Sequence, residues 1–352
     1  MQYRPLGRSG LKVSTLVLGT MSFGGKGMFS MVAENGINEA RRQFDMLIDA
    51  GVNMVDTADI YSMGESERIV GEAIQGKRDS LLLASKVRSP VGDRPNESGL
   101  SRHHIKRACE ASLKRLGTDY LDLYWAHEWD GLASLEEVLR AFDDLRREGK
   151  INYFGISNWA GWQVMKALGV SEREGLIRPV AQQIHYSLQS REAEYELMPI
   201  SVDQDVSILA WSPLAAGLLG GKITRENPKP VGTRQTAGWP EPPMRDWEAL
   251  WLIVDELKAV AGGRGSTPAQ VALAWLLTRP GVTSLVIGAR TEAQLKENLA
   301  AADITLSTEE IDRLERVSRP PLLYPYWHQK ANATDRLSAA DHALLDQHPK
   351  PY

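Results

Sequence analysis

Cysteine is nearly absent from this sequence, and its scarcity limits the covalent and metal-based ways of stabilising a fold. The chain of 352 residues has one cysteine, Cys109. A single thiol excludes an internal disulfide and a metal cage built from several thiolates. Cys109 lies in a stretch with helical patterning, and we interpret it as a small packed residue. Stability must therefore come from a core, for which a hydrophobic content of 43% is ample.

Long apolar runs and a strong excess of charge are missing as well. No run of about 18 apolar residues occurs, and the first five residues lack the apolar segment of a signal peptide. A net charge of −4 gives no reason to expect nucleic acid or an anionic membrane as a partner. We therefore expect a cytoplasmic globular protein with neither kind of partner.

The common nucleotide-binding motifs are also absent. Neither G-x-G-x-x-G nor G-x-x-x-x-G-K-[ST] occurs anywhere in the chain. The segment 217–222, Gly-Leu-Leu-Gly-Gly-Lys, comes closest to a phosphate loop but lacks both the spacing and the Ser or Thr. Any nucleotide must therefore be bound by a different arrangement of residues.

The sequence does contain a repeated alternation of short apolar strands and amphipathic helices. Eight strands are predicted, each followed by a helix, and this count favours an α/β fold of the closed (β/α)8 TIM barrel type over an open doubly wound sheet. The predicted strands cover residues 15–18, 53–55, 81–86, 120–125, 153–156, 180–184, 206–211 and 284–287.

The remaining segments are expected to extend this barrel within one domain over residues 1–352. We predict an N-terminal hairpin over 3–14, the barrel over about 15–317 and extra helices near its C-terminal end. One helix is predicted over 192–204. A segment rich in glycine and proline, 217–243, reads as a long insertion, and residues 318–352 read as an irregular tail.

Three successive strands each deliver an ionisable group at or just past the C-terminal end. Asp56 follows the strand 53–55 and leads to Tyr61, Lys86 ends the strand 81–86, and His127 follows the strand 120–125. Parallel α/β folds place their chemistry at this end of the strands. We therefore predict that the four side chains form one proton-handling cluster.

The chemistry of this cluster suits protonation of an oxygen. A phenol has an ordinary pKa of about 10, and a nearby lysine cation lowers it by stabilising the phenolate. Asp56 would keep Lys86 protonated, and His127 would bind the same substrate oxygen. Hydride for reducing a carbonyl must come from a cofactor, since no side chain supplies it. Taken singly, Asp56 could be a cap, Tyr61 a packing residue and Lys86 a solvated strand end.

Polar uncharged residues and an indole mark the ends of later strands. Ser157 and Asn158 follow the fifth strand, Gln183 lies in the sixth and Trp211 ends the seventh. Such groups could hold a nicotinamide by hydrogen bonds to its carboxamide and by ring stacking, although Ser157 and Asn158 could also be a simple helix cap. The segment 288–290 opens a helix after the eighth strand, a favourable place for a phosphate.

Taken in order, these motifs resemble the aldo-keto reductase superfamily from residue 3 to about residue 317. The residues that carry the resemblance are Tyr3–Gly10, Asp56–Tyr61, Ser85–Lys86, Ala126–His127, Gly155–Asn158, Gln182–Gln183, Trp211–Leu214 and Ile287–Arg290, with Gln294 and Asn298. Each motif alone is weak, and their order makes the set specific.

The resemblance implies a barrel that binds NADPH at its C-terminal mouth and reduces an aldehyde or ketone. Tyr61 would be the general acid tuned by Asp56 and Lys86, and His127 would orient the carbonyl. Many members carry an arginine at the position of Gln294 that pairs with the 2′-phosphate. Arg290 could replace it here, so NADPH is preferred and NADH remains possible. The implied cofactor-binding residues are Gly19, Thr20, Ser157, Asn158, Gln183, Trp211, Ser212, Leu214, Gly217, Lys222, Gly288, Arg290, Gln294 and Asn298.

The substrate and the alternatives to this activity are predicted from fewer residues. Trp129 and Trp239 lie in expected mouth loops, and we predict that they line a pocket for bulky or hydrophobic carbonyl compounds. We expect no metal site, since no second histidine lies at helical spacing from His127. Two alternatives stay open: a Schiff-base lyase that uses Lys86, and a non-catalytic NADP-binding regulatory subunit, because some relatives of the superfamily associate with membrane channels.

Overall fold

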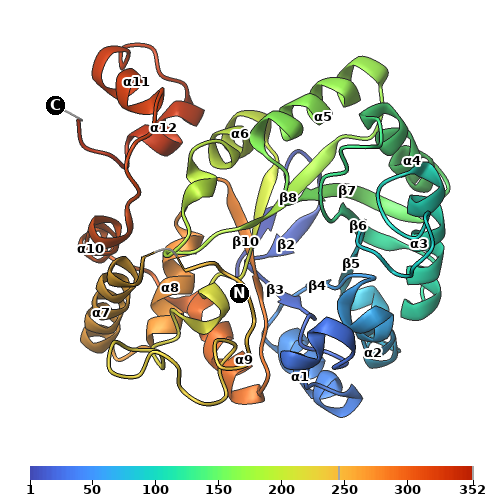
Figure 1. Cartoon of the computed structure of the whole chain (residues 1–352), viewed down its shortest axis with the longest axis horizontal. Helices are drawn as coiled ribbons and strands as arrows, with labels where there is room; N and C mark the ends of the chain where they lie inside the picture. The colour runs from blue at the N-terminus through green and yellow to red at the C-terminus, as the bar shows by residue number, and fades with distance from the viewer. Residues whose placement is uncertain (245, 351–352) are drawn as a thin grey trace.

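Eight parallel strands close into a barrel in the computed structural model, which describes residues 1–244 and 246–350. The strands follow the chain in order around the barrel, and β10 pairs with β3 to close it (Figure 1). Their bounds are β3 (Leu16–Gly19), β4 (Met54–Asp56), β5 (Leu82–Val87), β6 (Leu121–Ala126), β7 (Ile151–Ser157), β8 (Pro179–His185), β9 (Ser207–Trp211) and β10 (Val282–Ile287). The predicted (β/α)8 barrel is confirmed.

Helices surround this barrel (Figure 1). The α-helices are α1 (Ile37–Asp49), α2 (Glu65–Ala73), α3 (Arg102–Leu116), α4 (Leu135–Arg147), α5 (Gly161–Glu174), α6 (Leu197–Gln204), α7 (Trp247–Arg264), α8 (Pro268–Leu277), α9 (Glu292–Leu299), α10 (Thr308–Ser318), α11 (Tyr326–Asn332) and α12 (Ala339–Leu345). Local sequence defines their ends. The Ser101 side chain caps α3 by accepting from the His104 N–H, and Gly117 ends the helix in a left-handed conformation that suits glycine.

The N-terminal hairpin, β1 (Tyr3–Pro5) and β2 (Lys12–Ser14), lies at the end of the barrel where the strands begin. Its Gly7 N–H donates to the Ser207 hydroxyl at the start of β9, at 2.7 Å. Leu6 and Val13 join the side chains that fill the barrel interior, among them Trp125, in one buried cluster. The predicted hairpin is confirmed, and it leaves the opposite end of the barrel to the residues that follow the strands.

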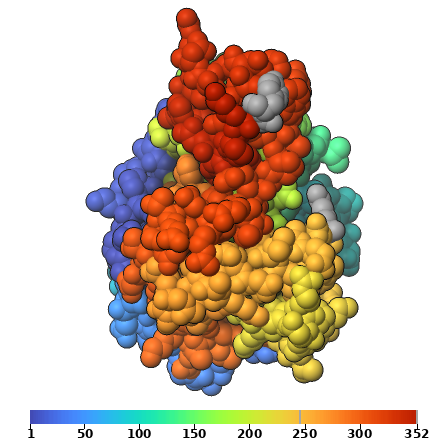
Figure 2. Space-filling model, turned by 90° about the vertical axis from the view of Figure 1, so that its left-hand side faces the viewer, coloured from blue at the N-terminus to red at the C-terminus, as the bar shows by residue number. Residues whose placement is uncertain are grey.

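Residues 318–352 were predicted to be irregular, and this prediction was wrong for part of the segment. The structure has two short helices there, α11 and α12, which Figure 2 shows in red on the outside of the molecule. Ser338 and Asp341 form a capping box that starts α12, and Leu344 and Leu345 are buried as α12 packs against α6. So short an apolar stretch gives no periodicity to read in the sequence.

The helix predicted over 192–204 is shorter than expected. A 3₁₀ turn covers Glu192–Glu194, and α6 begins only at Leu197. The turn is shaped by Arg191, whose buried guanidinium donates to the Glu194 carboxylate at 2.7 Å and also pairs with Glu315 of α10.

Within the described residues, no helix has the length and apolar character required to cross a bilayer.

The interior of the barrel has no room for a side chain at Gly155. A Cβ there would lie 2.3 Å from the Trp125 ring and 3.2 Å from the Ala181 carbonyl oxygen. Gly155→Ala should therefore lower the free energy of unfolding by about 1–3 kcal/mol in urea titrations, because overpacking displaces the buried indole. Gly169→Ala in α5, where a Cβ meets nothing within 4 Å, should instead be neutral or stabilising by up to about 1 kcal/mol. Equal urea midpoints for the two variants would contradict this account.

Candidate active site

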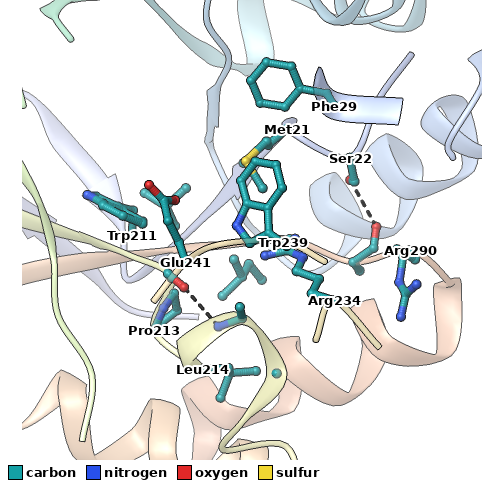
Figure 3. A pocket seen from close by; sticks show the side chains of 18 of the residues that line it. Met21, Ser22, Phe29, Trp211, Pro213, Leu214, Arg234, Trp239, Glu241 and Arg290 are labelled. Atoms are coloured by element: carbon teal, nitrogen blue, oxygen red, sulfur yellow. Dashed lines mark hydrogen bonds between the residues drawn. The ribbon is translucent and has the colours of Figure 1, made fainter. Parts of the chain in front are cut away.

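A cavity of about 670 Å³ opens at the end of the barrel where the strands finish. Its walls come from the residues that follow several strands and from the insertion 217–243, and Figure 3 shows part of this lining. The volume lies in the range of small-molecule and cofactor sites. The cavity therefore occupies the position that parallel barrels use for catalysis.

Three of the predicted catalytic residues meet at the base of this cavity. The Lys86 ammonium donates to the Asp56 carboxylate, to the Thr57 carbonyl oxygen at 2.8 Å and to the Tyr61 hydroxyl at 3.2 Å. The second oxygen of Asp56 accepts from the Trp125 indole N–H at 2.8 Å. Lys86 and Asp56 are fully buried, while Asp56 and Tyr61 also border the cavity. The structure thus brings the acid, the lysine and the phenol together as predicted.

An unusual turn directs Tyr61 toward this cluster. Tyr61 is followed by Ser62 and Met63, whose φ angles of 50° and 58° are rare for residues other than glycine. The buried Ser62 hydroxyl donates to the Phe23 carbonyl oxygen at 2.8 Å and accepts from the Gly25 N–H at 3.1 Å. These bonds join the turn to the loop after β3, and backbone strain of this kind is frequent at functional sites.

The phenol of Tyr61 keeps its proton in this environment. Burial raises the pKa of Tyr61, and the Asp56 charge adds to this effect, whereas the Lys86 cation opposes it. The net direction is upward, so the lowering that the lysine alone would cause is outweighed. Burial lowers the pKa of Lys86, but Asp56 and Tyr61 raise it by more than burial lowers it, so the pKa of Lys86 is raised overall. The site therefore contains a neutral phenol beside a charged ammonium.

His127 lies beside the phenol on the same wall. The two rings are edge-on with centroids 6.0 Å apart, and both residues line the cavity. Burial, with the Lys86 and Arg88 cations, holds the pKa of His127 well below its usual range. The ring is therefore neutral at physiological pH, and its Nδ1 has no hydrogen-bond partner within the described residues. A neutral imidazole can donate one N–H to a substrate oxygen.

Two polar groups in the cavity wall are buried and unpaired. The hydroxyl of Ser157 and the amide nitrogen of Gln183 have no hydrogen-bond partner among residues 1–244 and 246–350. Both residues line the cavity; Ser157 is the last residue of β7, and Gln183 lies within β8. Buried polar groups normally have partners, so this part of the wall fits a ligand with an amide. Trp211 presents its indole beside them, backed by the His185 ring with centroids 4.6 Å apart.

Asn158 differs from these two residues because its side chain is already bonded. Its amide nitrogen donates to the His127 carbonyl oxygen at 3.2 Å and to Glu128 at 2.8 Å, and its oxygen accepts from the Trp211 indole at 2.9 Å. The backbone of Asn158 is left-handed, with a φ of 59°, which asparagine tolerates. Asn158 therefore connects the histidine side of the cavity with the indole side.

The far end of the cavity carries cations and helix-capping groups. The Arg290 N–H donates to the Gln294 side chain at 3.0 Å, and its guanidinium donates to the Gly232 carbonyl oxygen at 2.5 Å. Lys222 adds a second cation to this wall. Positive charge near the start of α9 suits a phosphate. The other predicted residues that line the cavity are Gly19, Ser212, Leu214, Gly217, Gly288 and Asn298.

Three predicted site residues do not line the cavity: Thr20, Trp129 and Lys86, which reaches it only through its bond to Tyr61. Thr20 is fully buried, with its hydroxyl 2.8 Å from that of Ser66. Trp129 packs instead on Trp159 and Trp162, with ring centroids 4.8 and 5.6 Å apart. In the same loop Asp130 accepts N–H bonds from residues 100 and 132. Trp239 does line the cavity, as predicted.

Sequence reasoning missed several other lining residues. Met21 and Phe29 come from the loop after β3, and Arg234 and Glu241 come from the insertion, where no periodicity points to an orientation. Glu128 also lines the cavity, and its position next to His127 was a usable signal.

Within the part of the chain that the structure describes, no group of three or more His, Cys, Asp or Glu side chains is placed to hold a metal ion.

A second buried acid lies close to the cluster. Asp59 is 2% exposed, and neither carboxylate oxygen has a hydrogen-bond partner among the described residues. Burial and the Glu67 charge hold its pKa well above the usual range, with Arg115 opposing them. Glu67 itself accepts from Arg115 and from the Ser85 hydroxyl, each at 2.5 Å. Asp59 is therefore a buried acid that favours its protonated form.

This raised pKa predicts a pH-dependent contribution of Asp59 to stability. From about pH 4 upward the folded state binds more protons at Asp59 than the unfolded state, so stability falls as pH rises through this range. Asp59→Asn removes the titration. Urea unfolding from about pH 4 to pH 8 should show the variant gaining stability relative to the parent as pH rises. The exposed Asp93→Asn change should give no such trend. If the stability of Asp59→Asn and that of the parent follow parallel curves against pH, the raised pKa of Asp59 is refuted.

Comparisons with known proteins agree with this geometry. A family model described as the Aldo/keto reductase family matches residues 15–319. The chain is 38% identical over 335 residues to the uncharacterized oxidoreductase YrpG of Bacillus subtilis (strain 168), covering 91% of this chain and 97% of that protein. It is 34% identical over 335 residues to a probable voltage-gated potassium channel subunit beta of Arabidopsis thaliana, with coverages of 90% and 96%.

A third relative is the versiconal hemiacetal acetate reductase of Aspergillus parasiticus. It is 32% identical over 349 residues, which cover 92% of this chain and 99% of that protein. The family model spans the whole barrel and the relatives match almost from end to end, which confirms the resemblance seen in the motifs. The chain belongs to the aldo/keto reductase family.

Proposed function

We propose that this protein reduces an aldehyde or ketone to the alcohol, reversibly, with hydride from NADPH and a proton from Tyr61. The observation that carries the proposal is the Tyr61 hydroxyl 3.2 Å from the Lys86 nitrogen, at the wall of a cavity that also contains His127. Family membership and relatives named as an oxidoreductase and a reductase support carbonyl reduction as the general activity.

The side chains divide the work of proton transfer among them. The neutral Tyr61 phenol donates its proton to the substrate oxygen, and the Lys86 cation stabilises the phenolate that remains. Asp56 keeps Lys86 charged and in place through their buried ion pair. His127, which is neutral because of burial, donates a hydrogen bond that orients the carbonyl oxygen toward Tyr61.

The cavity wall has residues suited to hold a nicotinamide cofactor. When bound, the nicotinamide supplies the hydride to the carbonyl carbon. Ser157 and Gln183, both buried and unpaired, would bind its carboxamide, and Trp211 would stack on its ring. Ser212, Leu214, Gly217 and Lys222 would follow the pyrophosphate, and Gly288, Arg290, Gln294 and Asn298 would surround the adenosine end. The cations support NADPH over NADH.

Other activities have less support from the site. The Lys86 nitrogen is buried and bonded to three oxygens, and Lys86 is not part of the cavity wall, which argues against a Schiff-base lyase. The channel-subunit names of some relatives describe those proteins, and the assembled Tyr61 cluster favours turnover here. We infer that the whole chain works as one domain on a small carbonyl substrate.

Loss of the phenolic hydroxyl tests the proton donor directly. Tyr61→Phe should lower kcat for carbonyl reduction by about 10²–10⁴-fold, the usual contribution of general acid catalysis. The affinity for NADPH, measured by fluorescence titration, should change less than about twofold because the Tyr61 hydroxyl is bonded to Lys86 and not to a residue proposed to hold the cofactor. The exposed Tyr324→Phe change serves as the control. Combined loss of turnover and NADPH binding in Tyr61→Phe would assign Tyr61 a structural role instead.

The proposed preference for NADPH depends on Arg290. Arg290→Ala should weaken NADPH binding by about tenfold, since charge-assisted bonds to phosphate contribute about 1.5–3 kcal/mol. NADH binding should change far less, because NADH has no 2′-phosphate. Dissociation constants for both cofactors measure the effect, with Arg316→Ala on the exposed side of α10 as the matched control. An equal loss for NADPH and NADH would remove Arg290 from 2′-phosphate recognition.

A further inference from the structure

The part of the cavity next to Tyr61 and His127 combines aromatic rings with carboxyl groups. Phe29 packs edge-on against Tyr61 with centroids 5.4 Å apart, and its ring lies 6.1 Å from that of Trp239. Met21 and Trp239 pack with Phe29 and Tyr61 in one cluster, and Figure 3 shows Met21, Phe29 and Trp239 in the cavity. Glu128 and Glu241 line the same cavity. None of these residues has a role in the proposed chemistry of hydride and proton transfer.

Glu128 is a half-buried carboxyl group whose negative charge is stabilised by few neighbouring groups. One oxygen accepts from the Asn158 amide at 2.8 Å, and no cation lies within ion-pair distance among the described residues. Burial raises the pKa of Glu128, Asn158 and the Arg88 cation oppose this, and Glu241 adds to it. Arg88 itself donates to the Trp129 carbonyl oxygen and does not line the cavity. The negative charge of Glu128 therefore faces the ligand space.

Glu241 brings a second carboxyl to the rim from the insertion 217–243. Glu241, Glu128 and Tyr61 all line the cavity, and the negative charge of Glu241 raises the pKa of both other groups. Burial raises the pKa of Glu241 itself, and Arg234 lowers it and so partly offsets the charge. In Figure 3, Glu241 and Trp211 lie to the left of Trp239, Arg290 lies to its right and Arg234 beneath it. Two carboxyl groups, Glu128 and Glu241, thus line the cavity together with the aromatic rings.

We propose that Glu128 and Glu241 make this subsite selective for aromatic carbonyl compounds that carry a positive charge, and that they exclude compounds carrying a carboxylate. The inference rests on the proposed carbonyl reduction and names its substrate class. A cationic group is attracted both to the carboxylates and to the faces of Trp239 and Phe29. An anionic group would meet like charge in a partly desolvated space, and such repulsion separates substrates that are alike in shape.

The test compares three benzaldehydes of similar size at about pH 8, far above the ordinary pKa of a glutamate carboxyl group. The para substituents are trimethylammonium, tert-butyl and carboxylate, and kcat/KM is measured by NADPH oxidation. For each aldehyde, dividing the kcat/KM of the variant by that of the parent enzyme cancels the intrinsic reactivity of the aldehyde. Glu128→Gln keeps the acceptor for Asn158 and removes only the charge. It should lower the ratio of cation to carboxylate turnover by about tenfold and leave the tert-butyl compound within about twofold.

Glu241→Gln should shift the ratio in the same direction by a smaller factor, since the Arg234 cation offsets part of the effect of the Glu241 charge. Glu309→Gln, on the exposed surface of α10, should leave the ratio unchanged. If both cavity variants reduce the tert-butyl compound but keep the parent's ratio of kcat/KM for the cationic aldehyde to that for the carboxylate aldehyde, this inference alone is overturned. A parent enzyme that prefers the carboxylate aldehyde would overturn it as well. No NADPH oxidation with any of the three aldehydes would overturn the proposed function and the inference with it.

Discussion

The buried ion pair between Lys86 and Asp56 is the interaction on which the rest of the site depends. Two charges taken out of water are costly, and the cost is recovered only where geometry is favourable and further hydrogen bonds satisfy the remaining polar groups. Both conditions are met here, because Trp125 and the Thr57 carbonyl oxygen complete the coordination of the two charges. Removing either partner would leave an uncompensated charge inside the barrel.

The barrel places these groups by pairing adjacent strands in register. Asp56 of β4 lies beside Ala84 of β5, and Lys86 of β5 lies beside Trp125 of β6. A side chain from each of three neighbouring strands therefore reaches the same point. Gly155 on β7 makes room for the indole, so the proton-handling groups depend on interior packing as well as on hydrogen bonds.

Much of this arrangement could be predicted because strand ends are visible in a sequence. Asp56, Lys86 and His127 each follow an apolar run, and parallel strands bring such positions together. The packing of Trp129 on Trp159 and Trp162 could not be predicted, since it joins an irregular loop to a separate segment of the chain. Arg234 and Glu241 belong to a glycine- and proline-rich segment without periodicity. The two tail helices were missed because each is only seven residues long.

The insertion 217–243 forms a wall of the cavity, yet its residues belong to no strand of the barrel. Substitutions there alter the shape and charge of the pocket while the ion pair beneath stays intact. The molecule thus carries its reaction centre on and just after the barrel strands and part of its recognition surface on a separate insertion. Such modularity gives evolution a route to new substrates that leaves the folding of the scaffold untouched.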